Sequence, residues 1–236
     1  AYAFLSQYEK AITYYEQSLP IFTQVKNKDG EANALNNLGE AYHNLSQYGK
    51  AITYYEQALL IFIQVKDKNA EALVLNNLGL AYQALGNYGA SVDLFQKQLD
   101  LAREIKNRGS EAIALGRIGS AYYSIKRYSE AIEYFQQALI IVQEQRDRLY
   151  EVSLLHELGN TYLKLGQNQQ AIEVLQKKLA LDREIGNRAG EMNSLFSLGW
   201  AYNFEGKYQQ AIKFFQQTLA IAREIGARDK EISSLY

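Results

Sequence analysis

Residues 36–42 read Asn-Asn-Leu-Gly-Glu-Ala-Tyr, and versions of this stretch return along the whole chain at a spacing of 40 residues. Each copy has a glycine that is followed by a tyrosine three residues later. The glycines are Gly39, Gly79, Gly119, Gly159 and Gly199. Such a period is typical of a stacked array in which each supersecondary unit packs only against its neighbours. The sequence of 236 residues therefore predicts one elongated solenoid instead of one or two ordinary globular domains.

Each repeat is expected to contain two helices, called helix A and helix B in chain order. In the unit that begins at Gly30, apolar residues recur at three- and four-residue steps over 31–45 and again over 48–65. We expect further A helices at about 71–85, 111–125, 151–165 and 191–205. We expect further B helices at about 88–106, 128–146, 168–186 and 208–226, after a leading one at about 8–26. The predicted fold class is all-α, a solenoid of antiparallel helix pairs.

The repeats are expected to form a single domain over residues 1–236. Five full repeats cover 30–69, 70–109, 110–149, 150–189 and 190–229, between a partial repeat at 1–29 and the start of a further one at 230–236. Because both ends match the interior of a repeat, we expect a piece of a longer protein, without a signal peptide. Pro20 falls inside the leading helix B and is expected to bend it.

The repeated glycine and the many tyrosines predict how the helices pack. A glycine inside a helix costs about 1 kcal/mol relative to alanine. Its return in five repeats therefore predicts that a neighbouring helix passes too closely for a side chain. The 19 tyrosines are expected to bury their rings and to keep their hydroxyls at a polar edge.

The composition excludes several classes of function. The formal net charge is −1 with acidic and basic residues interleaved, which argues against nucleic acid and anionic membranes as partners. The absence of cysteine excludes disulfides, thiolate metal sites and thiol nucleophiles. No apolar run approaches the roughly 20 residues that span a bilayer.

The repeat pattern resembles a known family. Its elements are Leu-Gly-x-x-Tyr, a tyrosine at the start of helix B, and then Ala-x-x-x-Tyr/Phe-x-x-Ala. In the repeat at 30–69 these are Leu38, Gly39, Tyr42, Tyr48, Ala51, Tyr55 and Ala58. The pattern resembles the tetratricopeptide repeat over the whole chain, although the period exceeds the common length of about 34 residues. It is similar to the long repeats of kinesin light chains and spindle-orientation adaptors, and to arrays in bacterial, especially cyanobacterial, regulatory proteins.

The resemblance implies a right-handed superhelical solenoid whose A helices line a concave, peptide-binding groove. Its contact positions lie six, three and two residues before the helix A glycine, and one and four residues after it. The peptide-binding residues that this implies are Asn33, Asn36, Asn37, Glu40, Asn77, Leu80, Gln83, Arg117, Tyr123, Asn160, Phe196 and Trp200. Asn37 and Asn77 match the position that hydrogen-bonds an extended peptide backbone in long-repeat adaptors, since an amide side chain both donates and accepts. The alternative interpretation of these asparagines is a solvated polar helix face.

The expected groove changes from polar to apolar along the chain. Asn36 and Glu40 lie in its polar part, whereas Phe196 and Trp200 lie in its apolar part. Aromatic anchors in a concavity are frequent centres of recognition. Alternatively, a further repeat of the longer protein buries Trp200. The position three residues before the glycine carries no cation, which argues against the carboxylate clamp of chaperone-binding relatives.

No motif for catalysis or metal binding is found. His43 and His156 lie in different repeats without partners at metal-ligand spacing, and there is no phosphate loop or nucleophile triad. We expect no enzyme activity, no metal and no cofactor. The predicted function is a cytoplasmic module that binds a protein or peptide, and not nucleic acid or a membrane. The alternatives are self-association by end-to-end stacking of exposed terminal repeats, and an accessory sensing domain that controls an enzyme elsewhere in the longer protein.

Overall fold

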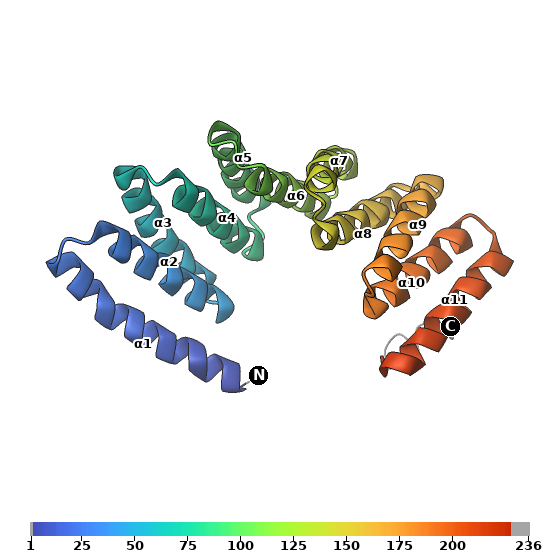
Figure 1. Ribbon diagram of the computed structural model, residues 1–236, viewed down its shortest axis with the longest axis horizontal. Coiled ribbons are helices and arrows are strands. Elements are labelled where there is room, and N and C mark those ends of the chain that lie inside the picture. Colours follow the sequence, from blue (N-terminus) through green and yellow to red (C-terminus); the bar gives the residue numbers. More distant parts are fainter. Residues whose placement is uncertain (1, 228–236) are drawn as a thin grey trace. The chain divides into compact units, whose positions relative to one another are not determined.

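The computed structural model describes residues 2–227, with side chains from residue 7 onward (Figure 1). This part of the chain forms eleven α-helices joined by short turns and contains no strand. In unit 1, defined below, the helices are α1 (Tyr2–Gln24), α2 (Lys28–Asn44), α3 (Tyr48–Val65), α4 (Lys68–Ala84), α5 (Tyr88–Glu104) and α6 (Arg108–Ser124). In unit 2 they are α7 (Tyr128–Gln145), α8 (Arg148–Leu165), α9 (Asn168–Glu184), α10 (Arg188–Phe204) and α11 (Tyr208–Ile225). The all-α prediction is confirmed.

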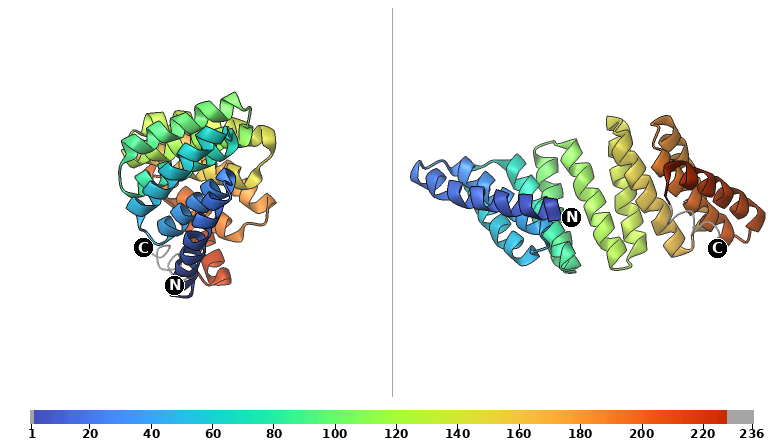
Figure 2. Two further views of the ribbon diagram at one scale, coloured as in Figure 1. Left: turned by 90° about the vertical axis from the view of Figure 1, so that its left-hand side faces the viewer. Right: turned by 90° about the horizontal axis from the view of Figure 1, so that it is seen from below.

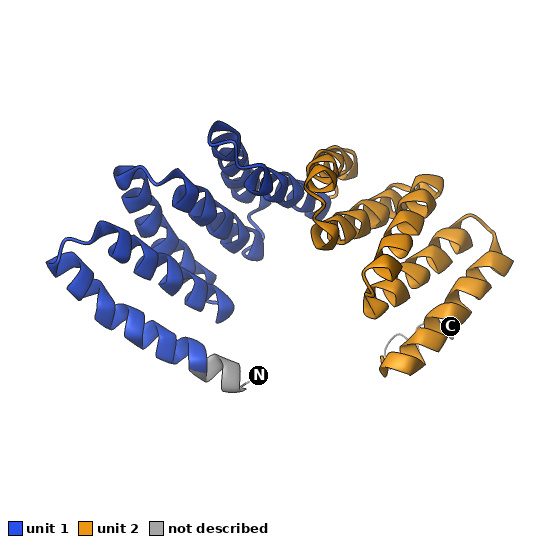
Figure 3. Ribbon diagram, viewed as in Figure 1, with its two compact units in different colours: residues 1–125 blue, residues 126–236 orange. Residues whose placement is uncertain are grey.

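The chain divides into two compact units, unit 1 at residues 1–125 and unit 2 at residues 126–236 (Figure 3). The division falls between helix A and helix B of the expected repeat at 110–149. Within each unit, every helix packs against the next helix along the chain (Figure 2). The single domain and its repeat boundaries stay predictions, and the expected start of a repeat at 230–236 lies outside the described residues.

The A helices begin three residues earlier than expected. Residues 66–70 fall between the expected helices at 48–65 and 71–85, but Asp67 caps α4 by accepting hydrogen bonds from the backbone N–H groups of Asn69 and Ala70. Asn107 caps α6 in the same way through the N–H of Ser110. A side-chain oxygen at this position satisfies backbone donors that the first turn of a helix leaves free. The leading helix α1 also begins earlier, at Tyr2, and continues through Pro20.

A residue with left-handed backbone conformation follows each described helix. These residues have positive φ and stand 20 positions apart, alternating between the ends of B and A helices. They are Lys26, Ser46, Lys66, Gly86, Lys106, Lys126, Arg146, Gly166, Gly186, Gly206 and Gly226. The left-handed residue ends the helix and lets two backbone N–H groups return to its last carbonyls. At Lys66, for example, the N–H groups of Lys66 and Asp67 donate to the carbonyls of Ile63 and Phe62.

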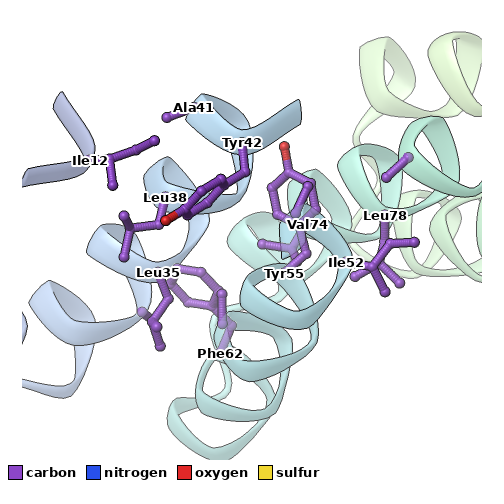
Figure 4. Close-up of a cluster of buried hydrophobic side chains, with 14 residues drawn as sticks. Ile12, Leu35, Leu38, Ala41, Tyr42, Ile52, Tyr55, Phe62, Val74 and Leu78 are labelled. Carbon is purple, nitrogen blue, oxygen red and sulfur yellow. The ribbon is translucent and has the colours of Figure 1, made fainter. Parts of the chain in front are cut away.

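The core of each unit lies between successive helices. Leu38 and Tyr42 of α2 pack with Tyr55 of α3 and Val74 of α4 in one buried cluster (Figure 4). The helix A glycine makes room for this packing, because a Cβ atom on Gly39 would lie 2.6 Å from Cδ1 of the Tyr55 ring. The prediction of a close approach is confirmed here, and the approaching group is the large side chain of helix B.

The tyrosines of helix A connect neighbouring repeats. The ring of Tyr42 is buried, and its hydroxyl donates to Glu16 Oε1 at 3.3 Å. The hydroxyl of Tyr162 accepts a hydrogen bond of 2.9 Å from Gln136 Nε2. Both partners lie 26 residues earlier, on the preceding helix B. These contacts agree with the expected buried ring and polar hydroxyl, whereas Tyr14 and Tyr208 are 70% and 63% exposed and do not follow that expectation.

Arginine and glutamate form ion pairs where one repeat meets the next. Glu111, buried near the start of α6, accepts hydrogen bonds from Arg103 Nε at 3.0 Å and from Arg108 at 2.8 Å. Burial alone would raise the pKa of Glu111, but the two arginines bring it below its ordinary value. Glu191 is held in the same way by Arg183 and Arg188. The acidic residues at the starts of α6 and α10 therefore have a structural role, which is to pair with two arginines each.

Candidate functional site

The A helices of successive repeats lie closer together than the B helices. Contacts with Cα atoms within 8 Å join α2 to α4 and α4 to α6 in unit 1, and α8 to α10 in unit 2. Among the described helices of each unit, no such contact joins one B helix to the next B helix of the same unit. This difference places the A helices on the inner side of the curve within each unit, which is where a ligand can touch several repeats at once.

Three asparagines on α2 and α4 form a chain of hydrogen bonds on this inner side. Asn77 Nδ2 donates to Asn36 Oδ1 at 3.1 Å, and Asn76 Nδ2 donates to Asn77 Oδ1 at 3.2 Å. Asn36 is only 7% exposed, and Asn77 is half-buried. The contact between Asn36 and Asn77 fixes the two amides side by side across a repeat boundary. We call the pocket beside Asn36 and Asn77 the asparagine pocket.

The asparagine pocket has a volume of about 300 Å³. Its lining residues are Asn36, Glu40, His43, Asn44, Tyr55, Leu73, Asn77 and Leu80. Four of the predicted peptide contacts therefore lie together: Asn36, Glu40, Asn77 and Leu80. Leu73 and Leu80 form an apolar part of the pocket wall. A ligand can therefore meet both amide groups and an apolar surface there.

Two buried polar atoms at this place have no hydrogen-bond partner among the described residues. They are Nε2 of His43, which lines the pocket, and Oδ1 of Asn76. Burial lowers the pKa of His43, with Glu40 acting in the opposite direction, so the neutral imidazole is favoured. An unsatisfied buried polar group costs about 1–3 kcal/mol. A ligand that supplies partners here would recover part of that free energy.

The other predicted contacts of unit 1 do not line this pocket. Asn33 is exposed, and its amide donates to the backbone carbonyl of Asp29 at 2.8 Å. Asn37, Gln83, Arg117 and Tyr123 are half-buried. The position two residues before the glycine thus enters the pocket as Asn77 but not as Asn37.

In unit 2, the predicted contacts fall into two groups. Asn160 Nδ2 lies 3.0 Å from His156 Nε2 on the same helix. Phe196 and Trp200 meet edge to face with ring centroids 6.3 Å apart, and Phe215 of α11 contacts both rings. Trp200 remains 39% exposed. The apolar character expected around Phe196 and Trp200 is therefore a packed aromatic cluster with an accessible tryptophan.

A buried ionic network in unit 2 was missed by the sequence analysis. Lys178 of α9 is 3% exposed, and its Nζ donates to Asp182 Oδ2 at 2.8 Å and to Ser194 Oγ at 2.9 Å. Asn187 Nδ2 donates to the other oxygen of Asp182 at 2.8 Å. Buried alanines, Ala58 and Ala138, occupy the position of Lys178 in other repeats. Gln98 and Thr218 occupy it in the remaining full repeats, so a lysine at a repeat position that otherwise carries no charge was the available signal.

A second polar pocket lies beside this network. It has a volume of about 360 Å³ and lies between α8, α9 and the first turns of α10. Its lining residues are Val152, Ser153, His156, Glu157, Lys178, Asn187, Ala189, Gly190 and Asn193. We call it the Glu157 pocket. Glu157 occupies the groove position that corresponds to Asn37, Asn77, Arg117 and Ser197 in the other repeats.

Over the part of the chain that the structure describes, no group of three or more histidine, aspartate or glutamate side chains is arranged to hold a metal ion. Within residues 2–227, no helix combines the length and the apolar character needed to cross a membrane.

Helix pairs that repeat along the chain, each packed against the neighbouring pairs, define the class of helical repeat proteins. The sequence profile of the tetratricopeptide repeat matches residues 1–64, 70–144 and 150–224, and the chain belongs to this family. Proteins built from this repeat are protein-interaction scaffolds. No curated protein matches the sequence.

Solved structures support the same fold. BtubC (BKLC) from P. vanneervenii has a TM-score of 0.82 and 15% identity, with 93% of this chain and 92% of that chain covered. A putative kinesin light chain with nearly identical TPR-like repeats, from Podosopora anserina, has a TM-score of 0.71 and 22% identity, with coverages of 81% and 95%. A Rap protein complexed with competence and sporulation factor has a TM-score of 0.68 and 18% identity, with coverages of 99% and 70%.

Proposed function

We propose that this protein binds a peptide segment of a partner protein on the inner faces of its A helices. The observation that carries the proposal is the hydrogen bond between Asn36 and Asn77 in a pocket that is also lined by His43, whose Nε2 has no hydrogen-bond partner among the described residues. The role is recognition and not catalysis. Membership of a family of protein-interaction scaffolds supports it.

The chemistry of the asparagine pocket suits a peptide backbone. An extended peptide presents alternating N–H and C=O groups, and an amide side chain can pair with both. Nε2 of His43 and Oδ1 of Asn76 add further polar atoms without a described partner. A pocket of about 300 Å³ beside Leu80 provides space for one side chain of the ligand.

The remaining predicted contacts extend this proposal to both units. In unit 1, Asn33, Asn37, Gln83, Arg117 and Tyr123 are proposed as additional contacts. In unit 2, Asn160 is a proposed polar contact, and Phe196 and Trp200 are proposed apolar anchors. A small number of residues, often aromatic, usually contribute most of the binding free energy of an interface. A solved structure of the same fold, that of a Rap protein, is a complex with competence and sporulation factor.

The test is a selection of 12-residue peptides from a displayed library, followed by calorimetric titration of the best binder. Asn77→Ala is expected to weaken binding by about tenfold, since one or two hydrogen bonds worth about 1 kcal/mol each are lost. The control is Asn69→Ala, because Asn69 is an exposed asparagine in the first turn of α4. Equal loss in both variants, or no loss in Asn77→Ala, would refute the assignment. Light scattering of the free protein separates peptide binding from end-to-end stacking, which would give a mass that rises with concentration.

A further inference from the structure

The Glu157 pocket contains a carboxylate that no described residue neutralises. Glu157 is half-buried on α8 and has neither a hydrogen bond nor an ion pair through its side chain among the described residues. Burial alone raises its pKa. Glu111 and Glu191, near the starts of α6 and α10, are each paired with two arginines. Glu157 differs because it faces a pocket instead of a cation.

The one lysine that lines the pocket does not supply the missing charge. Lys178 Nζ is engaged by Asp182 Oδ2 and Ser194 Oγ, and it lies 3.5 Å from the carbonyl oxygen of Gly190. These three partners use the three donors of the ammonium group. The charge of Lys178 is balanced by Asp182, so the pair leaves the pocket with the negative charge of Glu157.

The start of α10 does not turn the pocket into an anion site. The N–H of Gly190 donates to Asn187 Oδ1 at 3.0 Å, and the N–H of Glu191 donates to the carbonyl of Asn187 at 2.8 Å. These backbone donors are therefore satisfied within the chain. An anion entering the pocket would meet Glu157 without gaining these N–H groups.

We propose that the Glu157 pocket binds a cationic side chain, arginine or lysine, of the partner peptide. The proposal rests on the proposed function and names the chemistry of one ligand residue. A partly desolvated carboxylate pairs more strongly with a cation than an exposed one does. His156, Ser153 and Asn193 line the same pocket with further polar groups, and a volume of about 360 Å³ accommodates a guanidinium or an ammonium group. The repeat at 110–149 carries Arg117 at the equivalent position, so the preference for charge differs from repeat to repeat.

The test uses acetylated, amidated pentapeptides Ala-Ala-Xaa-Ala-Ala in which Xaa is arginine, lysine or citrulline. Citrulline has the shape of arginine without its charge. Binding is measured by amide chemical shifts of the isotope-labelled protein. The arginine or the lysine peptide is expected to shift amides of α8 and α10 around Glu157 and to bind at least about tenfold more tightly than the citrulline peptide, which is the effect of one charge-assisted hydrogen bond.

Glu157→Gln is expected to abolish the preference for a cationic peptide over the citrulline peptide. Its circular dichroism spectrum should be the same as that of the original protein. Glu173→Gln, at an exposed glutamate of α9 that does not line the pocket, is the control and should leave the preference unchanged. Equal binding of the arginine and citrulline peptides, a preference that survives in Glu157→Gln, or no saturation by either cationic peptide at millimolar concentration would each overturn the proposal. The assay reads only residues around the Glu157 pocket, whereas the titration of the selected peptide reads the asparagine pocket, so failure at one pocket and failure at the other can be told apart.

Discussion

Removal of Lys178 tests how the buried ionic network contributes to stability. In Lys178→Met, the ammonium is lost while the length of the side chain is nearly kept. Asp182 is fully buried and would retain hydrogen bonds from Asn187 and Ser194 but no cation. Breaking a buried ion pair by removing one partner typically costs about 3–5 kcal/mol. Because two donors remain, we expect a loss of about 3 kcal/mol, at the lower end of that range.

A triple variant gives the matched comparison. Lys178→Ala, Asp182→Val and Ser194→Leu together install the residues of the preceding repeat. The residues they copy, Ala138, Val142 and Leu154, are all buried there. Replacing a whole buried ionic group by well-packed apolar residues is often neutral or stabilising by about 1–4 kcal/mol. The triple variant is therefore expected to be at least as stable as the original protein, although it lacks every charge of the network.

Urea unfolding monitored by the fluorescence of Trp200 measures both effects. Trp200 lies on α10, the helix that also carries Ser194, so its signal reports on this repeat. Circular dichroism of the same samples shows whether the rest of the chain unfolds together with it, which repeat proteins need not do. The reasoning is refuted if Lys178→Met loses less than about 1 kcal/mol, or if the triple variant is no more stable than Lys178→Met.

Three further predictions concern packing, helix ends and pH. Gly39→Ala is expected to destabilise the fold by about 1–3 kcal/mol, because its methyl group would overlap the ring of Tyr55. The control Gly49→Ala should be neutral or stabilising, because a Cβ atom there has nothing within 4 Å. Thermal unfolding of the two variants tests this difference, and equal stability of both would contradict it. Lys66→Gly is expected to stabilise by up to about 1 kcal/mol in urea unfolding, because Lys66 has a φ of 62° that glycine adopts without strain, and a lower midpoint would contradict this. The pKa of Glu111 is lowered in the folded state, so its ion pairs stabilise above the unfolded value and are lost as pH falls through the folded one. Glu111→Gln should thus reduce stability at pH 7 but not at strongly acidic pH, and an equal loss at both would exclude this explanation.

The helices follow from the sequence because the apolar period of each repeat survives in every copy. The close contact of Gly39 with Tyr55 was predicted in part. A costly glycine at a fixed helix position implies a close neighbour, but it does not say that the neighbour is the ring of Tyr55. The starts of the A helices were placed too late, because Asp67 and Asn107 look like turn residues until their side chains are seen to cap the helix. Local polarity is the same for a turn residue and for a cap.

The candidate site was predictable only in part. Repeat position alone brought Asn36, Asn77 and Leu80 into the same region, and the structure places them in one pocket. The repeat position could not show which of Asn36 and Asn37 turns towards Asn77. Neighbouring residues differ by about 100° in their direction around the helix. Lys178 was assigned no role, since a lysine is almost never buried unless its charge is paired, and its partners lie 4 and 16 residues away.

The most direct test of peptide recognition at the asparagine pocket is a paramagnetic label on the peptide selected from the displayed library. The side-chain amide signals of Asn36 and Asn77 are recorded with and without the labelled peptide bound. The proposed function predicts that the label broadens both signals and leaves the amide of Gln57, on the exposed surface of helix B, unchanged. Broadening of Gln57 with unchanged signals from Asn36 and Asn77 would show that the peptide binds elsewhere.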